Sequence, residues 1–367
     1  MLHKVQISLN LEQESPLQKY LLSHQIRWEK EHLVEWLTVD MAHVVMLHAK
    51  GIVSKNDAAK NLKTLVALRQ DGTDVVNHKG LLLIGIIEEI MANRIGASAA
   101  GILRIGRSQL DHIPTVARLS ARHKFLEVMA NMIDVEEALL SFAKKYQDVL
   151  VPYHTHGQYS QPGTVGHFML AHLFRIGQDF KLCQHMFAEL NKCPLGSTGR
   201  CGTPWGIDRF MTAELLGFDE PIRHSILGRE PDWAMNTAAA LARVTTSLGQ
   251  LATDIHFWLS SDIRYADINR SHCSGSSIFA HKKNPQTTDK IRIYAGEAAH
   301  WYGIALSTCR GMGTGDHFIR QIPELETWID KTNQATLSAI GQERKVRPYA
   351  SGGLRYRGEI GHSSRAE

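Results

Sequence analysis

The chain has 367 residues, of which 43% are hydrophobic and 21% charged, and this ordinary globular composition excludes global disorder and a fibrous repeat. Its 41 basic and 37 acidic residues give a net charge of +4, with the basic residues scattered along the sequence. Nucleic-acid binding depends on clustered Lys and Arg, so this pattern argues against it, whereas an anionic small-molecule partner fits the mild positive bias.

The cysteines, the N-terminal residues and the length of the apolar runs are used to predict the cellular compartment. The five cysteines are odd in number and no pair has Cys-X-X-Cys spacing, so we expect reduced thiols rather than disulfides or a zinc site. Residues 1–8 lack the charged start and apolar core of a secretory signal. The longest apolar run, residues 81–87, is too short to span a bilayer. These features predict a cytoplasmic protein that does not bind membranes.

Shorter helices are predicted in the first part of the chain. Residues 23–50 are predicted to form a helix that stops at Gly51, because glycine readily adopts the backbone conformation that follows helix ends. Ser54 is placed to cap a second helix that ends near Arg69. A third helix is predicted over residues 80–95, followed by a glycine-rich loop over residues 96–106.

Four longer helices are predicted after that point, over residues 116–150, 165–190, 234–260 and 287–308. In the first, apolar residues recur at roughly helical spacing at Val116, Leu119, Leu126, Met129, Ile133, Leu140 and Phe142. In the third, a coiled-coil-like seam alternates steps of three and four at Leu241, Val244, Leu248, Leu251, Ile255 and Trp258. Such helices favour an all-α bundle whose core is shared in a homo-oligomer. A coiled-coil structural protein is the alternative, and the glycine-rich segments between the helices argue against it.

The predicted organisation has three parts. Residues 1–107 form an N-terminal helical domain, residues 108–344 form the central long-helix bundle, and residues 345–367 form a short tail. The Gly-, Arg- and Ser-rich composition of the tail is typical of a disordered or truncated end.

Residues 274–285 carry the most informative motif, in which Ser274, Gly275, Ser276 and Ser277 precede a cationic stretch that ends in Asn-Pro. Consecutive amides in such a loop can form an anion-binding nest, and Lys282 adds a positive charge for a carboxylate. A serine hydroxyl in this environment can act as a base, because nearby cations and amides favour its ionised form. By composition alone, such a segment is more often a surface loop than a site.

Residues 152–162 join two long helices and contain His154 and His156. Two histidines without a third ligand nearby make an incomplete metal site. We therefore favour a polar loop in which one histidine has a catalytic or orienting role.

Two further segments are candidates for ligand contact. Residues 106–112 begin the first long helix, where free amides and the helix dipole can bind an anion, although simple capping by Ser108 would give the same pattern. Residues 194–204 form a glycine-rich connection without the Gly-Lys-Ser/Thr ending of a phosphate loop, so nucleotide binding is disfavoured.

Taken together, these motifs resemble the argininosuccinate lyase branch of the fumarase/aspartase superfamily. The resemblance covers residues 35–310, and four motifs occur in the family's order. They are Ala42-His43 with Gly51-Ile52, Thr155-His156 with Gln161-Pro162, Pro194-Leu195-Gly196-Ser197 leading to Ile207-Asp208-Arg209, and Gly275-Ser276-Ser277 with Lys282-Lys283-Asn284-Pro285.

The resemblance implies a small N-terminal helical domain followed by a bundle of long helices that forms the shared core of a homotetramer. It places active sites at junctions of three subunits. It also leads us to expect that the C-terminal helical domain usual in the family is missing or vestigial. The resemblance also implies β-elimination on a small carboxylate without a cofactor or metal ion.

The resemblance assigns roles to eight residues. Ser276 is the base, and His156, paired with Asp289 where the family has a glutamate, is the second acid/base or an orienting group. Thr155, Lys282 and Asn284 hold substrate carboxylates, and Ser108 and Gln161 also contact the substrate.

Departures from the family pattern bear on the substrate. Gln109-Leu110 stands where argininosuccinate cleavers have Arg-Asn, and leucine cannot donate a hydrogen bond to a carboxylate. We therefore predict carbon–nitrogen cleavage of an N-substituted aspartate other than argininosuccinate, with release of fumarate. A non-catalytic structural or binding homologue is the alternative, and so is elimination or isomerisation on another polycarboxylate.

Overall fold

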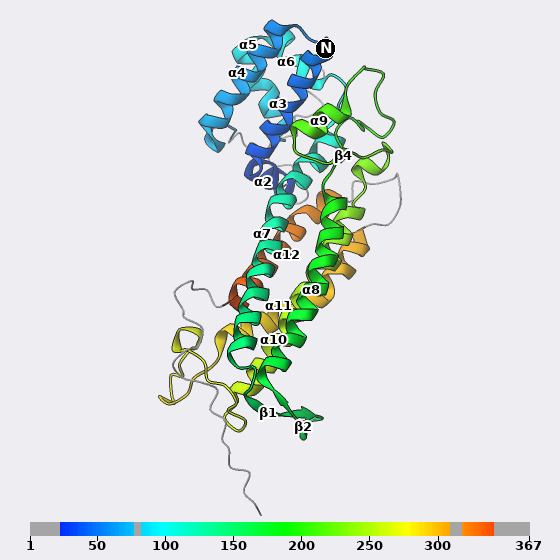
Figure 1. Ribbon diagram of the computed structural model, residues 1–367. Coiled ribbons are helices and arrows are strands. Elements are labelled where there is room, and N and C mark those ends of the chain that lie inside the picture. The colour runs from blue at the N-terminus through cyan, green and yellow to red at the C-terminus, as the bar shows by residue number, and fades with distance from the viewer. Residues whose placement is uncertain (1–22, 77–81, 309–317, 341–367) are drawn as a thin grey trace, which may run out of the picture. The chain divides into compact units, whose positions relative to one another are not determined.

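The computed structural model describes residues 23–76, 82–308 and 318–340. Most of these residues are helical, as the sequence predicts, and the strands belong to two small two-stranded sheets (Figure 1). The expectations for residues 1–8, for Leu81 and for the tail from residue 345 lie outside the described residues. Within these ranges, no helix is long and apolar enough to cross a membrane.

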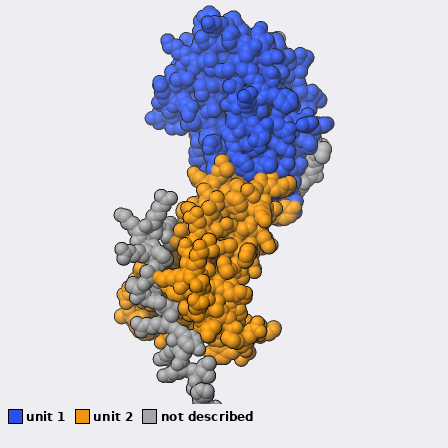
Figure 2. Space-filling view, viewed as in Figure 1, with its two compact units in different colours: residues 1–124, 186–237, 305–327 blue, residues 125–185, 238–304, 328–367 orange. Residues whose placement is uncertain are grey.

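The chain divides into two compact units (Figure 2). Unit 1 comprises residues 1–124, 186–237 and 305–327, and unit 2 comprises residues 125–185, 238–304 and 328–367. The predicted boundaries at residues 107 and 344 stay a prediction.

Unit 1 contains the shorter helices. The helix predicted over residues 23–50 is present but breaks at His32, and it ends at Ala49, two residues before Gly51, whose φ of 68° is readily adopted by glycine. Ser54 caps the next helix by accepting the Asp57 amide at 3.1 Å, as predicted. The short helices are α2 (Ser23–Glu31), α3 (Leu33–Ala49), α4 (Lys55–Asp71), α5 (Leu83–Ile95), α6 (Ala97–Ala100) and α9 (Arg209–Leu215).

The stretch over residues 96–106, predicted to be a loop, contains α6 and the 3-10 turn η3 (Gly101–Arg104). The buried Asn61 amide of α4 donates to the Ala99 carbonyl at 2.8 Å and ties this turn to the core. Small residues therefore allow close packing here rather than a free loop. Further 3-10 turns are η2 (Thr73–Val76), η4 (Leu227–Arg229) and η5 (Arg270–His272).

Five long helices follow: α7 (Gln109–Lys145), α8 (Val165–Leu190), α10 (Asp232–Leu259), α11 (Gln286–Thr308) and α12 (Phe318–Ile340). The first four match the predicted segments, although α7 begins at Gln109 rather than near residue 116. The sequence analysis did not foresee α12.

The core of unit 2 confirms the seam predicted on α10. Of its six residues, Leu241, Val244, Leu248, Leu251 and Trp258 are at most 5% exposed, and Ile255 is half-buried. Helices α10 and α11 approach closely, since a Cβ added at Gly249 would lie 2.3 Å from the Cβ of Ala295. Helices α11 and α12 meet where the stacked rings of Trp301 and Trp328 lie 5.9 Å apart.

The apolar residues predicted on α7 divide between buried and exposed positions. Leu126, Ile133 and Leu140 are 46%, 44% and 39% exposed, so they lie outside the core of the single chain. The buried positions in this part of α7 are instead Phe125, Val128, Met132, Val135 and Leu139. The helix therefore has two apolar faces, and helical spacing alone does not tell which one a single chain buries.

The strands are short. Strands β1 (Leu150–Thr155) and β2 (Gln158–Thr164) pair as an antiparallel hairpin between α7 and α8, in the segment predicted to be a polar loop. Strands β3 (Lys192–Cys193) and β4 (Glu220–Pro221) form a two-residue parallel pair in unit 1.

Glu29 gives a pH-dependent test of the unit 1 core. Its carboxylate is fully buried and accepts hydrogen bonds from the Gln25 amide and the Leu83 backbone, each at 2.8 Å. Burial raises its pKa from 4.5 to about 7 despite these donors and a bond to Gln109. Between pH 4.5 and pH 7 the folded state therefore binds more protons than the unfolded state, and the stability of the fold falls as the pH rises through this range.

We expect wild-type protein to lose about 3 kcal/mol of unfolding free energy relative to Glu29→Gln between pH 4.5 and pH 7, measured by urea unfolding. Glu31→Gln, at an exposed position of the same helix, is the control and should leave the wild-type pH profile unchanged. Parallel profiles for wild type and Glu29→Gln would contradict the assignment.

Candidate active site

The Gly-Ser-Ser segment forms a loop that is closed at its base. The Ser274 amide donates to the Asn284 carbonyl at 2.9 Å, and the Asn284 amide donates to the Ser274 carbonyl at 3.0 Å. Lys283 adds an ion pair with Asp267 at 3.2 Å. The intervening residues project as one loop, and the exposed side chains of Ile278 and Phe279 are 80% and 53% accessible.

Ser276 is held inside this loop by backbone donors. Its Oγ accepts the amides of Ile278 at 3.3 Å and Phe279 at 3.1 Å. The Asn284 side-chain amide donates to the Gly275 carbonyl at 3.4 Å and braces the same turn. Because donors that point at an oxygen favour its ionised form, the geometry suits a serine that gives up its proton.

Lys282 lies in the same loop and is exposed. Its backbone amide donates to the Phe279 carbonyl at 3.1 Å. Among the described residues, no carboxylate forms an ion pair with its ammonium group, whereas Lys283 is paired. Its charge is therefore available for an anion.

Thr155, His156 and Gln161 lie on the β1–β2 hairpin and are exposed. Thr155 pairs with Gln158, so His156 and Gly157 form a two-residue turn with φ values of 54° and 74°. Positive φ at both positions is typical of a type I′ turn, whose twist matches that of the strands. The turn fixes His156 at the hairpin tip.

The hairpin is held at its base by Tyr153. A Cβ at Gly163 would lie 2.3 Å from the Tyr153 ring, so only glycine fits opposite this ring. The Tyr153 hydroxyl bonds with the Thr164 carbonyl at 3.0 Å and with His167 Nδ1 at 2.7 Å. The segment is thus an ordered hairpin, because a paired glycine and tyrosine stabilise it.

Within the described part of a single chain, no contact pairs His156 with Asp289, and this pairing stays a prediction. Asp289 lies in the first turn of α11, where its Oδ1 is 3.6 Å from Nδ1 of His256 and 3.4 Å from Arg292. Because α11 packs on α10, the imidazole that reaches this carboxylate comes from α10. Sequence reasoning missed His256, and no local motif marks it.

Ser108 lies in unit 1 and caps α7. Of the two interpretations of its motif, anion binding and helix capping, the capping is therefore present. The Ser108 Oγ accepts the Leu110 amide at 3.3 Å, and its own amide donates to the Asp111 carboxylate at 2.8 Å. The other oxygen of Asp111 accepts the amides of Gly196 and Thr198, each at 2.8 Å. Asp111 therefore joins two of the sequence motifs, and its place three residues after a serine is the signal that could have revealed it.

The eight predicted residues occupy four places. Ser276, Lys282 and Asn284 share one loop, and Thr155, His156 and Gln161 share the hairpin. Asp289 begins α11 in unit 2, and Ser108 belongs to unit 1. Within the described part of the chain, no hydrogen bond or ion pair connects the 274–284 loop with the hairpin.

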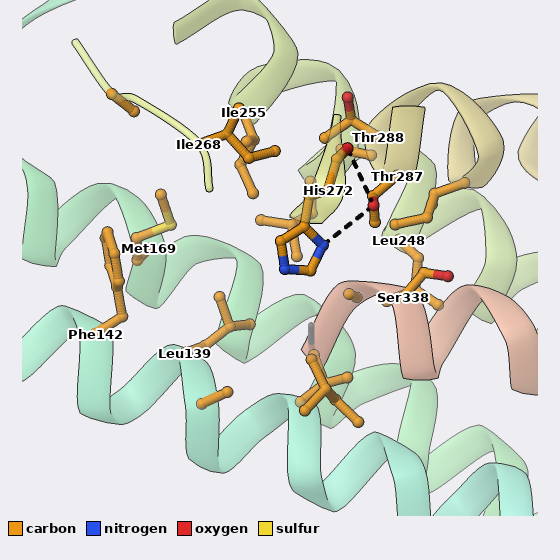
Figure 3. A pocket seen from close by; sticks show the side chains of 18 of the residues that line it. Leu139, Phe142, Met169, Leu248, Ile255, Ile268, His272, Thr287, Thr288 and Ser338 are labelled. Carbon is orange, nitrogen blue, oxygen red and sulfur yellow. Dashed lines mark hydrogen bonds between the residues drawn. The ribbon is translucent and has the colours of Figure 1, made fainter. Parts of the chain in front are cut away.

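A cavity of about 750 Å³ lies in unit 2, and none of the eight residues lines it. Its wall is mainly apolar, with Leu139, Phe142 and Leu248 pointing inward (Figure 3). His272 supplies a polar side, with its Nδ1 3.2 Å from the Thr287 hydroxyl. The cavity is therefore separate from the predicted catalytic groups.

The hairpin histidine His154 lies among aromatic rings. The His154 ring packs against the rings of Tyr159 at 5.0 Å, Phe257 at 5.1 Å and Tyr265 at 5.8 Å. In the part of the chain that the structure describes, no group of three or more His, Cys, Asp or Glu side chains could hold a metal ion.

Comparisons with known proteins agree with these motifs. The pattern of the family described as Lyase matches residues 13–299. The argininosuccinate lyase of Methanosarcina acetivorans is 30% identical over 277 residues, which cover 75% of this chain and 56% of that protein. The argininosuccinate lyase of Methanothrix thermoacetophila is 32% identical over 303 residues, which cover 82% of this chain and 61% of that protein. The chain thus spans less than two thirds of the curated relatives it matches.

Solved structures show the same fold. A variant of EDDS lyase with bound fumarate aligns with a TM-score of 0.77 at 25% identity, covering 90% of this chain and 66% of that one. The class II fumarase of Schistosoma mansoni aligns with a TM-score of 0.67 at 15% identity, covering 92% and 78%. From the motifs, the fold and the match over residues 13–299, the chain belongs to the lyase family and has the helical fumarase/aspartase fold.

Proposed function

We propose that this chain is a subunit of a carbon–nitrogen lyase that cleaves an N-substituted aspartate and releases fumarate. The observation that carries the proposal is the closed 274–284 loop, in which two amides face the Ser276 oxygen and Lys282 forms no ion pair with a described residue. Membership of the lyase family and the fumarate-bound EDDS lyase relative support it.

In the proposed reaction, the ionised Ser276 oxygen removes a proton from the carbon next to one substrate carboxylate and becomes a neutral hydroxyl. The electron pair is held as an aci-carboxylate, then forms the carbon–carbon double bond as the carbon–nitrogen bond breaks. His156 protonates the departing amine, so fumarate and the amine leave with all atoms and charges accounted for. In a single chain the Asp289 carboxylate faces His256, so its proposed pairing with His156 would require a hairpin from another copy.

Electrostatic stabilisation of the developing dianion is expected to supply most of the rate enhancement. Lys282 and Asn284 contribute a cation and an amide donor from the serine loop. Thr155 and Gln161 contribute polar groups from the hairpin, and Ser108 contributes a hydroxyl. The negative charge of the dianion would then develop beside hydrogen-bond donors and a cation that are already oriented towards it.

We further propose that the site is completed by assembly into a homotetramer whose subunits share active sites. The exposed residues Leu126, Ile133 and Leu140 recur every seven positions on α7, a spacing typical of helix–helix contacts. Burying them against other copies would remove apolar surface from water. It would also allow a hairpin from one copy to meet a serine loop from another.

A non-catalytic binding protein on the same scaffold is the second candidate. It is favoured by the separation of the four predicted site segments and by Leu110, which offers no hydrogen bond to a carboxylate. Elimination or isomerisation on another polycarboxylate would use the same Ser276 loop. A cytoplasmic location for any of these functions stays a prediction from composition.

Ser276→Ala tests the assigned base. We expect it to lower kcat by about 10²–10⁴-fold, because general-base catalysis contributes that much, with fumarate release followed by ultraviolet absorbance over a panel of N-substituted aspartates. The neighbouring exposed Ser277→Ala is the matched control and should keep wild-type rates. Full activity of Ser276→Ala would show that another group removes the proton, and fumarate release from no compound in the panel would favour the binding-protein candidate.

Ile133→Glu tests the proposed assembly. Placing a charge on the exposed α7 stripe should shift the protein towards smaller species in sedimentation velocity, because the charge would be buried between copies. Val66→Glu, at a 45% exposed position of α4 compared with 44% at Ile133, is the control and should leave assembly unchanged. Sedimentation of Ile133→Glu that matches wild type would show that this stripe is not an interface.

A further inference from the structure

Helices α10 and α11 pack so closely at one point that their register is fixed. A Cβ added at Gly249 would lie 2.3 Å from the Cβ of Ala295, so only glycine fits opposite this alanine. His256 lies seven residues after Gly249 on α10, and Thr288 lies seven residues before Ala295 on α11. Because seven residues make about two helical turns, antiparallel helices in this register bring the two side chains together. The packing therefore places the His256 imidazole at the first turn of α11.

The imidazole is oriented by the buried Thr288. The Thr288 hydroxyl donates its single proton to the Pro285 carbonyl at 2.8 Å, so its oxygen acts as an acceptor towards His256. Nδ1 of His256 lies 3.0 Å from this oxygen and therefore carries a hydrogen. The same Nδ1 is 3.6 Å from Oδ1 of Asp289. The positive end of this N–H group is consequently next to the carboxylate.

Other positive groups reach the same carboxylate oxygen. Nη1 of Arg292 lies 3.4 Å from Oδ1 of Asp289. Asp289 also lies in the first turn of α11, where the helix dipole favours a negative charge. The neighbouring carboxylate of α10, Asp254, is paired with His172 at 3.0 Å instead. Within the described part of the single chain, His256 and Arg292 thus both approach Oδ1 of Asp289.

Asp289 lies beside an open groove of about 920 Å³ between α8, α10 and α11. Arg175, Gln250 and Arg292 line this groove together with Asp289, whereas His256 does not line it. His256 therefore contacts the carboxylate from outside the groove and leaves the groove side accessible. A histidine of another copy that enters the groove can meet Asp289 without displacing His256.

We propose that His256 is a positioning residue, which holds the Asp289 carboxylate in the orientation that receives His156 from another copy. This inference rests on the proposed lyase function and on the proposed pairing of His156 with Asp289. Aspartate stands where the family has glutamate, and with one torsion fewer its carboxylate cannot adjust as far. A neighbouring donor therefore supplies the orientation. In this role His256 neither contacts the substrate nor moves a proton.

His256→Leu removes the Nδ1–H donor from a side chain that is 34% exposed. We expect kcat for fumarate release to fall about tenfold, near the low end of what a donor to a charged group contributes. KM should change little, because His256 does not contact the substrate. His256→Asn can donate from the place of Nδ1 and should retain most of the wild-type kcat. His185→Leu, at an exposed position of α8, is the control and should keep wild-type rates.

Asp289→Glu separates a positioning role from a structural one. Because the longer carboxylate can adjust by itself, His256→Leu is expected to lower kcat by less than about twofold in the Asp289→Glu background. A merely structural role for His256 would cost the same factor in both backgrounds. Circular dichroism and sedimentation velocity check that the four proteins fold and assemble alike.

His256→Glu keeps the inference testable if His256→Leu does not fold, because glutamate favours helices and suits a partly exposed position. A second carboxylate beside Asp289 should lower kcat by about tenfold or more through like-charge repulsion.

Four results separate the inference from the proposed function. Wild-type kcat in His256→Leu or His256→Glu, a kcat of His256→Asn as low as that of His256→Leu, or equal losses in the two Asp289 backgrounds would overturn the inference and leave the lyase function standing. Fumarate release by wild-type protein from no N-substituted aspartate would overturn the lyase function and the inference with it.

Discussion

The Asp111 carboxylate is the interaction on which the arrangement of unit 1 depends. It receives one amide from the start of α7 and two from the 196–198 turn, so one buried side chain sets both the first residue of the long helix and the course of a distant connection. A buried carboxylate costs free energy unless hydrogen bonds compensate it, and here backbone donors do so. Ser108 is consequently held by the backbone of its own helix start.

The two other site segments are stabilised in the same local way. The serine loop closes through its own backbone pair at Ser274 and Asn284, and the hairpin closes through the His156-Gly157 turn and the Tyr153–Gly163 contact. Each segment therefore presents its polar groups in a fixed geometry without help from the others. These two preformed segments and the exposed apolar residues Leu126, Ile133 and Leu140 of α7 are consistent with the proposed association between copies.

Sequence reasoning succeeds here where the physical signal is local. The spacing of the α10 seam, the stop at Gly51 and the Ser54 cap each depend on neighbouring residues, and the structure confirms them. Sequence reasoning is insufficient where the outcome depends on which distant helix or residue packs against the one considered. Helical spacing does not tell that Leu126 is exposed in the single chain, and no sequence motif shows that Asp289 lies beside His256. The Asp40–Arg107 pair likewise joins distant segments and leaves no sequence motif.

The central claim is that a serine loop from one copy and a hairpin from another make one active site, and mixing two inactive variants tests it most directly. Ser276→Ala and His156→Ala proteins would be dissociated together and allowed to reassemble, with each treated alone for comparison. The account predicts that the mixture regains fumarate release, because some mixed sites combine an intact loop with an intact hairpin. A mixture that forms mixed oligomers by sedimentation yet stays as inactive as its parents would contradict it.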